Sequence, residues 1–470
     1  MKKKIMVGMI LGASILSIPG CSSTKNTEVS ILATTDLHGY LPYELTSYIK
    51  NEKSKDKNTL LVDAGDFFDL GKSGSPMDKY FDTKWSDDAY NNKKYLEVPI
   101  AKEMKEVGYD TVVLGNHEFI KNNKFQLDNM VKDFKKQDID VLSANTYKKD
   151  GKNYLDPYVI KDISTPDGHV KVGILGLTIQ EVGQTYDESS SGQAKATSEG
   201  LKDFQGYNGE LYMADLIKEA NKWVNTMQKE NPDIILAVVH SGEESDINKY
   251  PGNRIKELAK EINGIDAIVA GHTHKEISQH TYKNKSGEKV IVTQPGKYGE
   301  CISKINFELE KNNNKWNIVD KSSDLTKFEK SKEDKNFDAF HKSICAFVEK
   351  ELKSDKMKET IHLSDITPFD WDKVYVFEPK TSSKTIYKTI GYKWQDIKPA
   401  NDKDMVQMVF MKNDKVVCHF YGYSKYLYLY LNFEKSEYKD SVVTIYPKDN
   451  DKFKIKIDGL WLTANLTHTN

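Results

Sequence analysis

The chain has 470 residues, 38% of them hydrophobic and 29% charged, a composition typical of a globular protein with two or three domains. Its formal net charge of −2 argues against the strongly basic surface of proteins that bind nucleic-acid polymers. Arg254 is the only arginine, which excludes phosphate binding by a cluster of guanidinium groups.

Residues 1–20 have the pattern of a secretory signal peptide. Lysines at positions 2–4 precede an apolar run over residues 5–18, which is too short to span a bilayer comfortably. Residues 18–21 resemble a bacterial lipoprotein cleavage box, although Pro19 stands where a small residue is usual. We therefore expect a lipid on Cys21, a tether over residues 21–28 and a location at the extracytoplasmic face of the cell membrane. Plain secretion is the alternative.

Five short apolar runs, predicted to be buried strands, lead into polar residues of the kinds that bind metals. These runs are residues 29–34, 59–62, 111–114, 234–239 and 267–270. The polar residues that follow them, in the same order, are Asp36 with His38, Asp66, Asn116 with His117 and Glu118, His240, and His272 with His274. Any one of these motifs is more often a helix cap, a turn or a surface histidine. Because sites in α/β proteins lie beyond the carboxyl ends of strands, the five together predict one shared site.

The last motif suggests how two histidines reach that site. His272 and His274 are two residues apart, so in extended backbone their rings would point the same way. We therefore expect both imidazoles to converge on one place.

Apolar spacing predicts the remaining elements of this part of the chain. Helices are expected over residues 43–51, 98–107, 125–136, 211–227 and 254–262. Further strands are expected over residues 141–144, 170–177, 290–293, 303–310 and 316–318, and polar loops over 70–93 and 180–204. This alternation by itself would favour a doubly wound parallel sheet.

The C-terminal part has a different character. Residues 320–335 are charged and linker-like, and residues 337–359 are predicted to form one helix. Residues 366–470 are predicted to form a small strand-rich module, with a hairpin turn at Asn413-Asp414. Tyrosines alternate with leucines over residues 426–432, which predicts a strand with a tyrosine face. That face either packs on the main domain or binds cell-wall glycans or a partner protein.

The mixture of carboxylate, imidazole and amide groups suits borderline or hard divalent ions such as Mn²⁺ or Zn²⁺. Two such ions about 3.5–4 Å apart, sharing one carboxylate, can activate water for the hydrolysis of a phosphoester. The set of polar residues therefore predicts a site for two divalent metal ions.

The ordered motifs resemble those of the calcineurin-like metallophosphoesterases. The resemblance is closer to their 5′-nucleotidase and 2′,3′-cyclic-nucleotide 2′-phosphodiesterase branch. It rests on residues 35–39, 107–110, 115–119, 142–145, 172–178, 264–267 and 294–299. It covers about residues 29–310 and implies an α/β fold of four layers, in which two packed β-sheets are flanked by helices.

The resemblance also implies a role for each site residue. Asp36, His38 and His274 would hold one metal ion. The second ion would be held by Asn116, His240 and His272. Asp66 would bridge the two ions, and His117 would be the catalytic histidine that stabilises developing charge and protonates the leaving oxygen.

Two positions depart from the branch. It usually carries Asp or Asn three residues after the catalytic histidine, to orient the imidazole, whereas this chain has Ile120. It commonly carries Gln-Gly where this chain has Asp69-Leu70. Because isoleucine cannot accept a hydrogen bond, His117 must find another orienting group here or be less well held.

These observations divide the chain into a signal peptide (1–20), a tether (21–28), a metallophosphoesterase domain (29–320), a linker with a connecting helix (321–365) and the C-terminal module (366–470). The predicted function is extracytoplasmic hydrolysis of nucleotides or similar phosphate monoesters and diesters by metal-activated water. The alternative is a cell-surface binding protein on the same scaffold with little catalysis. The expected partners are a small phosphoester, the membrane through the lipid anchor, and, for the C-terminal module, the cell wall or another protein.

Overall fold

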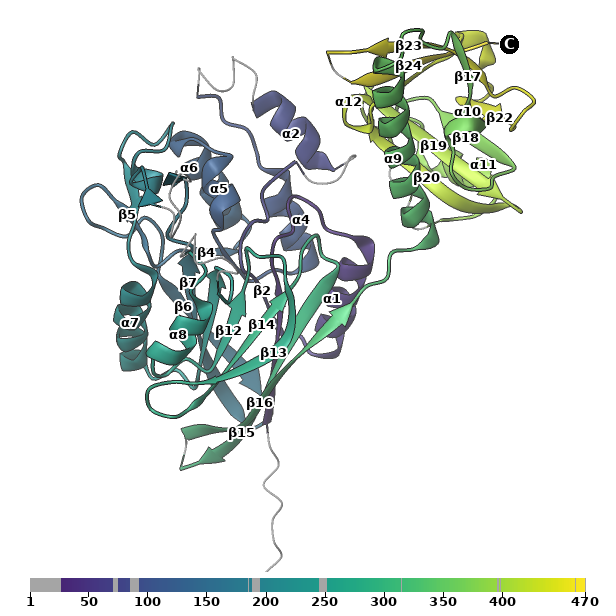
Figure 1. The fold of residues 1–470 in the computed structure, drawn as a ribbon. Helices are drawn as coiled ribbons and strands as arrows, with labels where there is room; N and C mark the ends of the chain where they lie inside the picture. The colour runs from purple at the N-terminus through teal and green to yellow at the C-terminus, as the bar shows by residue number, and fades with distance from the viewer. Residues whose placement is uncertain are drawn as a thin grey trace, which may run out of the picture.

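The computed structural model describes the greater part of the chain (Figure 1). The described residues are 27–70, 75–84, 93–184, 186–187, 195–244, 252–313, 315–394, 397, 399–460 and 462–469. The predicted signal peptide and Cys21 lie outside them. The last two residues of the predicted tether, Thr27 and Glu28, belong to the first strand.

Two six-stranded sheets form the centre of the main domain. The first has the order β16-β15-β1-β2-β3-β4, with β1 (Thr27–Thr34), β2 (Leu60–Asp63), β3 (Thr111–Val113), β4 (Asp140–Leu142), β15 (Cys301–Asn312) and β16 (Lys315–Lys327). The second has the order β13-β14-β12-β11-β7-β6, with β6 (Tyr158–Thr165), β7 (Gly168–Thr178), β11 (Ile234–His240), β12 (Ala267–Ala270), β13 (Glu276–Lys283) and β14 (Lys289–Pro295). In the first sheet, strands β1 to β4 pair in parallel, and β15 and β16 are joined by antiparallel pairings. In the second sheet, the central strands β14, β12, β11 and β7 pair in parallel, and the edge strands β13 and β6 are antiparallel to their neighbours.

The two sheets pack face to face because alternate residues of each strand point into the space between them. Ile31 and Val62 of the first sheet share a buried cluster with Leu236 and Val238 of the second. At Gly176 in β7 the sheets approach so closely that an added Cβ would lie 2.4 Å from the Cβ of Leu142 in β4.

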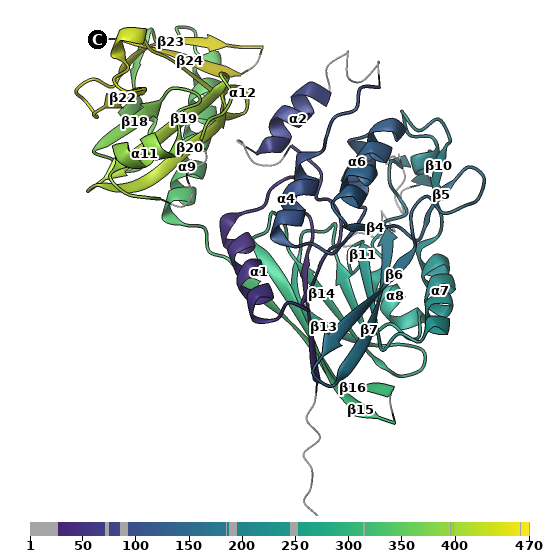
Figure 2. The same cartoon turned by 180° about the vertical axis from the view of Figure 1, so that it is seen from behind.

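The other face of each sheet is covered by helices (Figure 2). Helices α1 (Tyr43–Lys55), α4 (Pro99–Val107) and α6 (Lys124–Lys136) cover the first sheet, and α7 (Leu216–Met227) and α8 (Ile255–Glu261) cover the second. The predicted four-layer sandwich is therefore confirmed, and the single doubly wound sheet that alternation alone favoured does not occur.

Smaller elements surround the sandwich. They are α2 (Pro76–Lys84), α5 (Asn116–Ile120), the paired strands β5 (Thr146–Lys148) and β10 (Leu211–Met213), the paired strands β8 (Tyr186–Asp187) and β9 (Lys195–Ala196), and 3-10 turns at Gly200–Lys202 and Gln228–Glu230. Two predictions are corrected here. The segment 70–93, expected to be a loop, contains helix α2. The helix expected from residue 211 begins at Leu216, because the Asp215 side chain accepts a hydrogen bond from the Lys218 N–H and caps it.

The C-terminal module contains two four-stranded sheets, β17-β23-β24-β21 and β20-β19-β18-β22. Its elements are α9 (Lys332–Leu352), β17 (Thr360–His362), α10 (Leu363–Ile366), β18 (Lys373–Phe377), α11 (Ser383–Ile390), β19 (Met405–Lys412), β20 (Lys415–Tyr423), α12 (Ser424–Leu427), β21 (Leu429–Asn432), a 3-10 turn (Lys435–Glu437), β22 (Val442–Ile445), β23 (Lys452–Asp458) and β24 (Thr463–His468). The predicted hairpin turn is confirmed, since Asn413 and Asp414 both have positive φ, as a two-residue hairpin turn requires.

The connection between the two parts is shorter than the sequence suggested. Strand β16 continues to Lys327, through part of the segment expected to be a linker. Helix α9 begins at Lys332 and buries Phe340, Ile344 and Val348 in the core of the module. We therefore propose that the main domain ends with β16 and that α9 is the first element of the module.

The predicted tyrosine face does not form. Tyr426 lies in helix α12, and Tyr428 has a φ of 56° and ends that helix, so the strand begins only at Leu429. The Tyr426 hydroxyl donates a hydrogen bond to Asp82 of α2, whereas the ring of Tyr428 stacks on His341 with a centroid distance of 5.6 Å. Because Tyr426 lies in a helix and Tyr428 ends it, the two side chains contact different parts of the structure instead of sharing one face of a strand.

Helix α2 contacts the module, and it lies between the main domain and the module in Figure 1. Lys79 pairs with Asp402 at 2.6 Å, and Asp82 pairs with Lys425 at 3.0 Å. A cavity of about 450 Å³ lies beside these pairs and is lined by residues of both parts, Tyr421 and Tyr423 among them. Within the described residues, no helix combines the length and apolar character needed to cross a bilayer.

Candidate metal centre

Strand ends from both sheets bring the predicted site residues to one edge of the sandwich. Strands β1, β2 and β3 of the first sheet and β11 and β12 of the second lead to them: His240 ends β11, Asn116 and His117 lie in α5, and the others lie in turns. Five of these residues have positive φ: Asp36, His38, Asp66, His272 and His274. Residues other than glycine rarely adopt this conformation, and where they do the surrounding structure must hold it in place.

The expectation of extended backbone at His272 and His274 is therefore wrong. Their φ angles are 71° and 57°, and their rings turn to different groups of side chains. His274 lies with Asp36, whereas His272 lies with His240.

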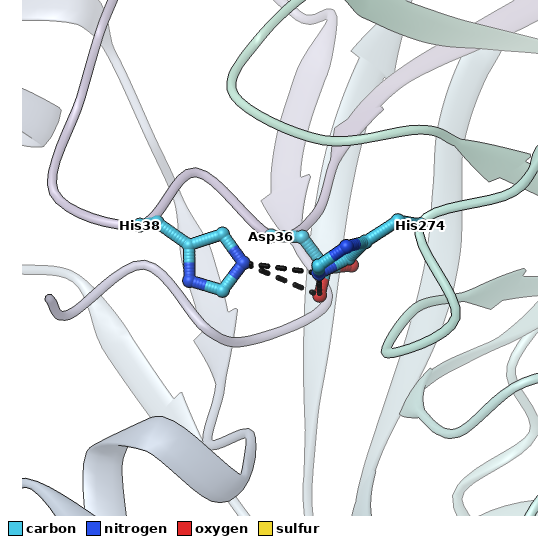
Figure 3. A group of neighbouring side chains, drawn as sticks. All are labelled: Asp36, His38 and His274. Carbon is cyan, nitrogen blue, oxygen red and sulfur yellow. Dashed lines mark hydrogen bonds and ion pairs between the residues drawn. The ribbon is translucent and has the colours of Figure 1, made fainter. Parts of the chain in front are cut away.

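The first group consists of Asp36, His38 and His274 (Figure 3). The Nε2 atoms of the two histidines are 3.1 Å apart, and Nε2 of His274 is 3.3 Å from Oδ1 of Asp36. Among the described residues, this buried Oδ1 atom has no hydrogen-bond partner. A buried carboxylate oxygen without a donor is costly, so three ligand atoms facing one another around it suit a bound cation.

The second group consists of Asn116, His240 and His272. Oδ1 of Asn116 lies 3.0 Å from Nε2 of His240 and 2.9 Å from Nδ1 of His272. Nδ1 of His240 lies 2.7 Å from the carbonyl oxygen of Ala64, which can only accept a hydrogen bond. The ring must therefore carry a proton on Nδ1, which leaves Nε2 to face the group as a ligand atom would.

Asp66 lies between the two groups. Its Oδ2 atom is 3.2 Å from Nε2 of His240, and its ligand atoms also lie near those of His38 and His117. Burial alone would raise the pKa of Asp66, but the nearby His240 and His117 lower it below its usual range. The carboxylate therefore stays ionised at the position that a bridging ligand needs.

The surroundings lower the pKa of two histidines of this site and raise the pKa of a third. Burial lowers the pKa of His38 and of His272 to about 4, so both rings are neutral and available as ligands. Burial also opposes protonation of His240, but the charge and hydrogen bond of Asp66 raise its pKa to about 10. The carboxylates therefore attract positive charge to the centre, and a divalent cation would supply it.

His117 lies on α5, next to the centre. Its backbone N–H donates to Oδ1 of Asp66 at 2.8 Å, and its Nδ1 atom is 2.7 Å from Oδ2 of Asp69. Its Nε2 atom faces the centre, 3.7 Å from Oδ2 of Asp66. A ligand atom of His117 also lies close to ligand atoms of His38 and Asp66.

Glu118 holds the loops that carry the site. Its buried carboxylate accepts hydrogen bonds from the backbone N–H groups of Asp66, Phe68 and Gly115 at 2.6 to 3.0 Å. Burial and the charge of Asp66 raise the pKa of Glu118 to about 8. These contacts give Glu118 a bracing function.

Two residues at the site, Tyr298 and Asp69, had no predicted role in it. The ring of Tyr298 lies 5.2 Å from that of His38, and its backbone N–H donates to the carbonyl oxygen of Asp36. Tyr298 belongs to a segment that carried the family resemblance, which was the available signal. Asp69 was noticed only as a departure from the family pattern.

Comparison with known proteins shows that one family model covers all the predicted residues of the centre. The family model described as calcineurin-like phosphoesterase matches residues 29–276. This range contains all seven predicted metal ligands and His117.

Three curated relatives illustrate the similarity. The trifunctional nucleotide phosphoesterase protein YfkN of Bacillus subtilis (strain 168) is 27% identical over 333 residues, covering 65% of this chain and 21% of the relative. A 2′,3′-cyclic-nucleotide 2′-phosphodiesterase/3′-nucleotidase of Yersinia enterocolitica is 24% identical over 349 residues, covering 68% and 49%. A 5′-nucleotidase of Vibrio cholerae serotype O1 is 26% identical over 360 residues, covering 68% and 57%. The matched part is thus less than two thirds of each relative's length.

A solved structure shares the fold of the main domain. The crystal structure of the calcineurin-like phosphoesterase YfkN from Bacillus subtilis superposes with a TM-score of 0.50 at 26% identity. The superposition covers 64% of this chain and 91% of the crystallised one.

Replacing Asp66 by Asn tests the centre directly. The substitution removes the negative charge between the two groups while keeping the size of the side chain. We expect about two divalent ions per chain in the unsubstituted protein and fewer in the purified variant. Metal content after loading with Mn²⁺ or Zn²⁺ and desalting, measured by mass spectrometry, gives the answer. Asp162→Asn, an exposed aspartate on β6, is the control and should match the unsubstituted protein. Full metal content in Asp66→Asn would remove Asp66 from the ligand set.

Proposed function

Because the chain belongs to the calcineurin-like phosphoesterase family, we propose that it hydrolyses nucleotides or similar phosphate monoesters and diesters with two divalent metal ions. The observation that carries the proposal is the pair of ligand groups on either side of the ionised Asp66. The names of the relatives, which are nucleotide phosphoesterases and nucleotidases, support the substrate class.

The proposed ligand sets follow the two groups. Asp36, His38 and His274 hold one ion, and Asp66 lies where it can be shared. Asn116, His240 and His272 hold the other. Mixed oxygen and nitrogen ligands favour Mn²⁺ or Zn²⁺. When bound, such a pair supplies Lewis-acid stabilisation of the phosphoryl oxygens and lowers the pKa of water that attacks the phosphorus.

His117 supplies the proton chemistry in this proposal. Although burial opposes protonation, the hydrogen bond to Asp69 and the charge of Asp66 raise the pKa of His117 above its usual value. A protonated ring whose Nε2 atom faces the centre can donate to a phosphoryl or leaving-group oxygen.

In this proposal the phosphate is bound without contacts from an arginine side chain. The guanidinium group of Arg254 contacts Asp215 and Glu257 at 2.8 to 2.9 Å, so it is engaged elsewhere. The metal ions, Asn116 and His117 are left as the main contacts for the phosphoryl group.

The activity is tested with the full-length protein, loaded with Mn²⁺ or Zn²⁺, on p-nitrophenyl phosphate and bis-p-nitrophenyl phosphate. His117→Ala should lower kcat by roughly 10²–10⁴-fold, the usual contribution of a general acid, while metal content stays unchanged. His169→Ala, an exposed histidine on β7 paired with Asp162, is the control and should leave kcat unchanged.

Two results would contradict this assignment. A fall in metal content in His117→Ala would make that residue a ligand. A metal-loaded protein that cleaves neither ester nor any nucleotide would favour the alternative, a surface binding protein on this scaffold.

The absence of an arginine clamp also sets an expectation for specificity. Simple aryl phosphoesters and nucleotides should be hydrolysed with kcat/KM values within about tenfold of each other, a gap of about 1.4 kcal/mol. The measurement is kcat/KM for p-nitrophenyl phosphate beside nucleotides with each of the four common bases.

The module offers one way for this expectation to fail, since Tyr421 and Tyr423 line the cavity beside α2. Stacking on an aromatic ring is worth about 1–3 kcal/mol per base in proteins that bind single strands. A nucleotide preferred by more than about a hundredfold, with the preference lost in Tyr423→Ala, would show that the module supplies a base clamp.

The proposed location is the extracytoplasmic face of the membrane, through a lipid on Cys21. The basis is the sequence pattern of residues 1–21. Expressed in a bacterium that processes lipoproteins, the protein should fractionate with membranes, and Cys21→Ser should shift it to the soluble secreted fraction. Cys345→Ser, within helix α9, is the control. Membrane association that persists in Cys21→Ser would rule out this attachment.

A further inference from the structure

Asp69 joins the two ends of the short segment that carries His117. Its Oδ2 atom lies 2.7 Å from Nδ1 of His117, and its Oδ1 atom lies 3.1 Å from Nζ of Lys121. Oδ1 also accepts the N–H of Leu70 at 2.8 Å. Both carboxylate oxygens are therefore occupied, one by the imidazole and the other by groups that hold the carboxylate in place.

The residue three positions after His117 cannot orient the imidazole through a hydrogen bond. Ile120 has no polar atom on its side chain, and 37% of its surface is exposed to solvent. The orienting group comes instead from the loop after β2, which lies beside α5 because Glu118 holds the Phe68 N–H at 2.9 Å. Asp69, one departure from the family pattern, thus contacts the imidazole that Ile120, the other departure, cannot orient.

Asp69 itself is not placed as a metal ligand. It belongs to none of the groups of facing ligand atoms, and its Oδ2 atom lies 3.9 Å from Nδ1 of His38, beyond hydrogen-bond distance. The oxygen involved is the one already bound to His117. Asp69 therefore acts on the centre through the histidine.

We propose that Asp69 is the positioning residue for His117, fixing its proton on Nδ1 and aiming Nε2 at the proposed metal centre. A carboxylate can only accept, so the short contact requires Nδ1 to be the donor. The hydrogen bond made by one ring nitrogen decides the state of the other. Lys121, four residues after His117, keeps the carboxylate in place. The inference rests on the proposed function only in that the aimed nitrogen acts on a phosphoester.

The tautomer is measured first, because it does not depend on turnover. In the metal-free protein labelled with ¹⁵N-histidine, NMR at a pH where the ring is neutral should find the His117 proton on Nδ1. The His117→Ala spectrum identifies the signals. Asp69→Ala should shift His117 towards the tautomer protonated on Nε2, whereas Asp69→Asn, which keeps an accepting oxygen, should shift it less. An Asp69→Ala spectrum with the Nδ1 proton unchanged would overturn the proposal.

A double-mutant cycle then tests the route of action in the metal-loaded enzyme. Asp69→Ala should lower kcat by roughly tenfold to a hundredfold, a part of the general-acid contribution, with KM and metal content nearly unchanged. In the His117→Ala background the same substitution should cost less than about threefold, because residues acting as one unit are not additive. Asp162→Ala, which removes the carboxylate from the exposed His169, is the matched control.

The leaving group gives a further readout. If His117 protonates the leaving oxygen, Asp69→Ala should slow an alkyl or nucleoside monophosphate more than p-nitrophenyl phosphate, whose leaving group needs little protonation. Full additivity in the cycle would show that Asp69 acts independently of His117, and loss of metal in Asp69→Ala would assign Asp69 to metal binding. Either result would overturn the proposal. Should Asp69→Ala fail to fold, Asp69→Asn carries the same comparison with a smaller expected change. Absence of turnover in every form would count against the proposed function alone, since the tautomer remains measurable.

Discussion

Two loops of the main domain approach each other so closely that neither can carry a side chain at the point of contact. A Cβ added to Gly65 would lie 2.6 Å from the backbone nitrogen of Gly115, and one added to Gly115 would lie 2.3 Å from Oδ1 of Asp66. Gly65 also has a φ of +95°, which glycine adopts without strain. This contact sets Asp66 at the middle of the centre, and the N–H groups held by Glu118 keep it there.

The position of the centre between two sheets follows from the same geometry. The first sheet brings Asp36, Asp66 and Asn116, and the second brings His240 and His272. A site divided in this way depends on how closely the sheets pack, and Gly176 allows the close approach. Buried carboxylates without enough positive charge would be unfavourable, so the proposed cations would also stabilise the fold that gathers them.

Helix α2 connects the centre with the C-terminal module. At its start, the Ser75 hydroxyl donates a hydrogen bond to the carbonyl oxygen of Gly39, next to His38. At its end, Lys84 is buried and donates to the carbonyl oxygen of Lys121 and to Oδ1 of Asn122, just beyond α5. Burial lowers the pKa of Lys84 to about 6, so this amine can be buried without its full charge. Lys79 and Asp82 of α2 contact Asp402, Lys425 and Tyr426 of the module, so one helix touches both the loops beside the proposed metal centre and the module.

The features that depend on local pattern could be predicted from the amino-acid sequence. Continuous apolar runs identified the buried parallel strands, and the polar residues after them identified the members of the site, because strand ends of this fold meet at one edge. The Asn413-Asp414 turn was equally local.

Other features depend on contacts between segments that are distant in the sequence. The alternation of tyrosine and leucine over residues 426–432 could not reveal that Tyr428 adopts left-handed backbone and breaks the strand. Helix α9 looked like a connector, but its apolar face is buried by the module. Asp69 became the partner of His117 only because the loop after β2 folds against α5, and hydrogen bonds between segments 48 residues apart leave no periodic signal in the sequence.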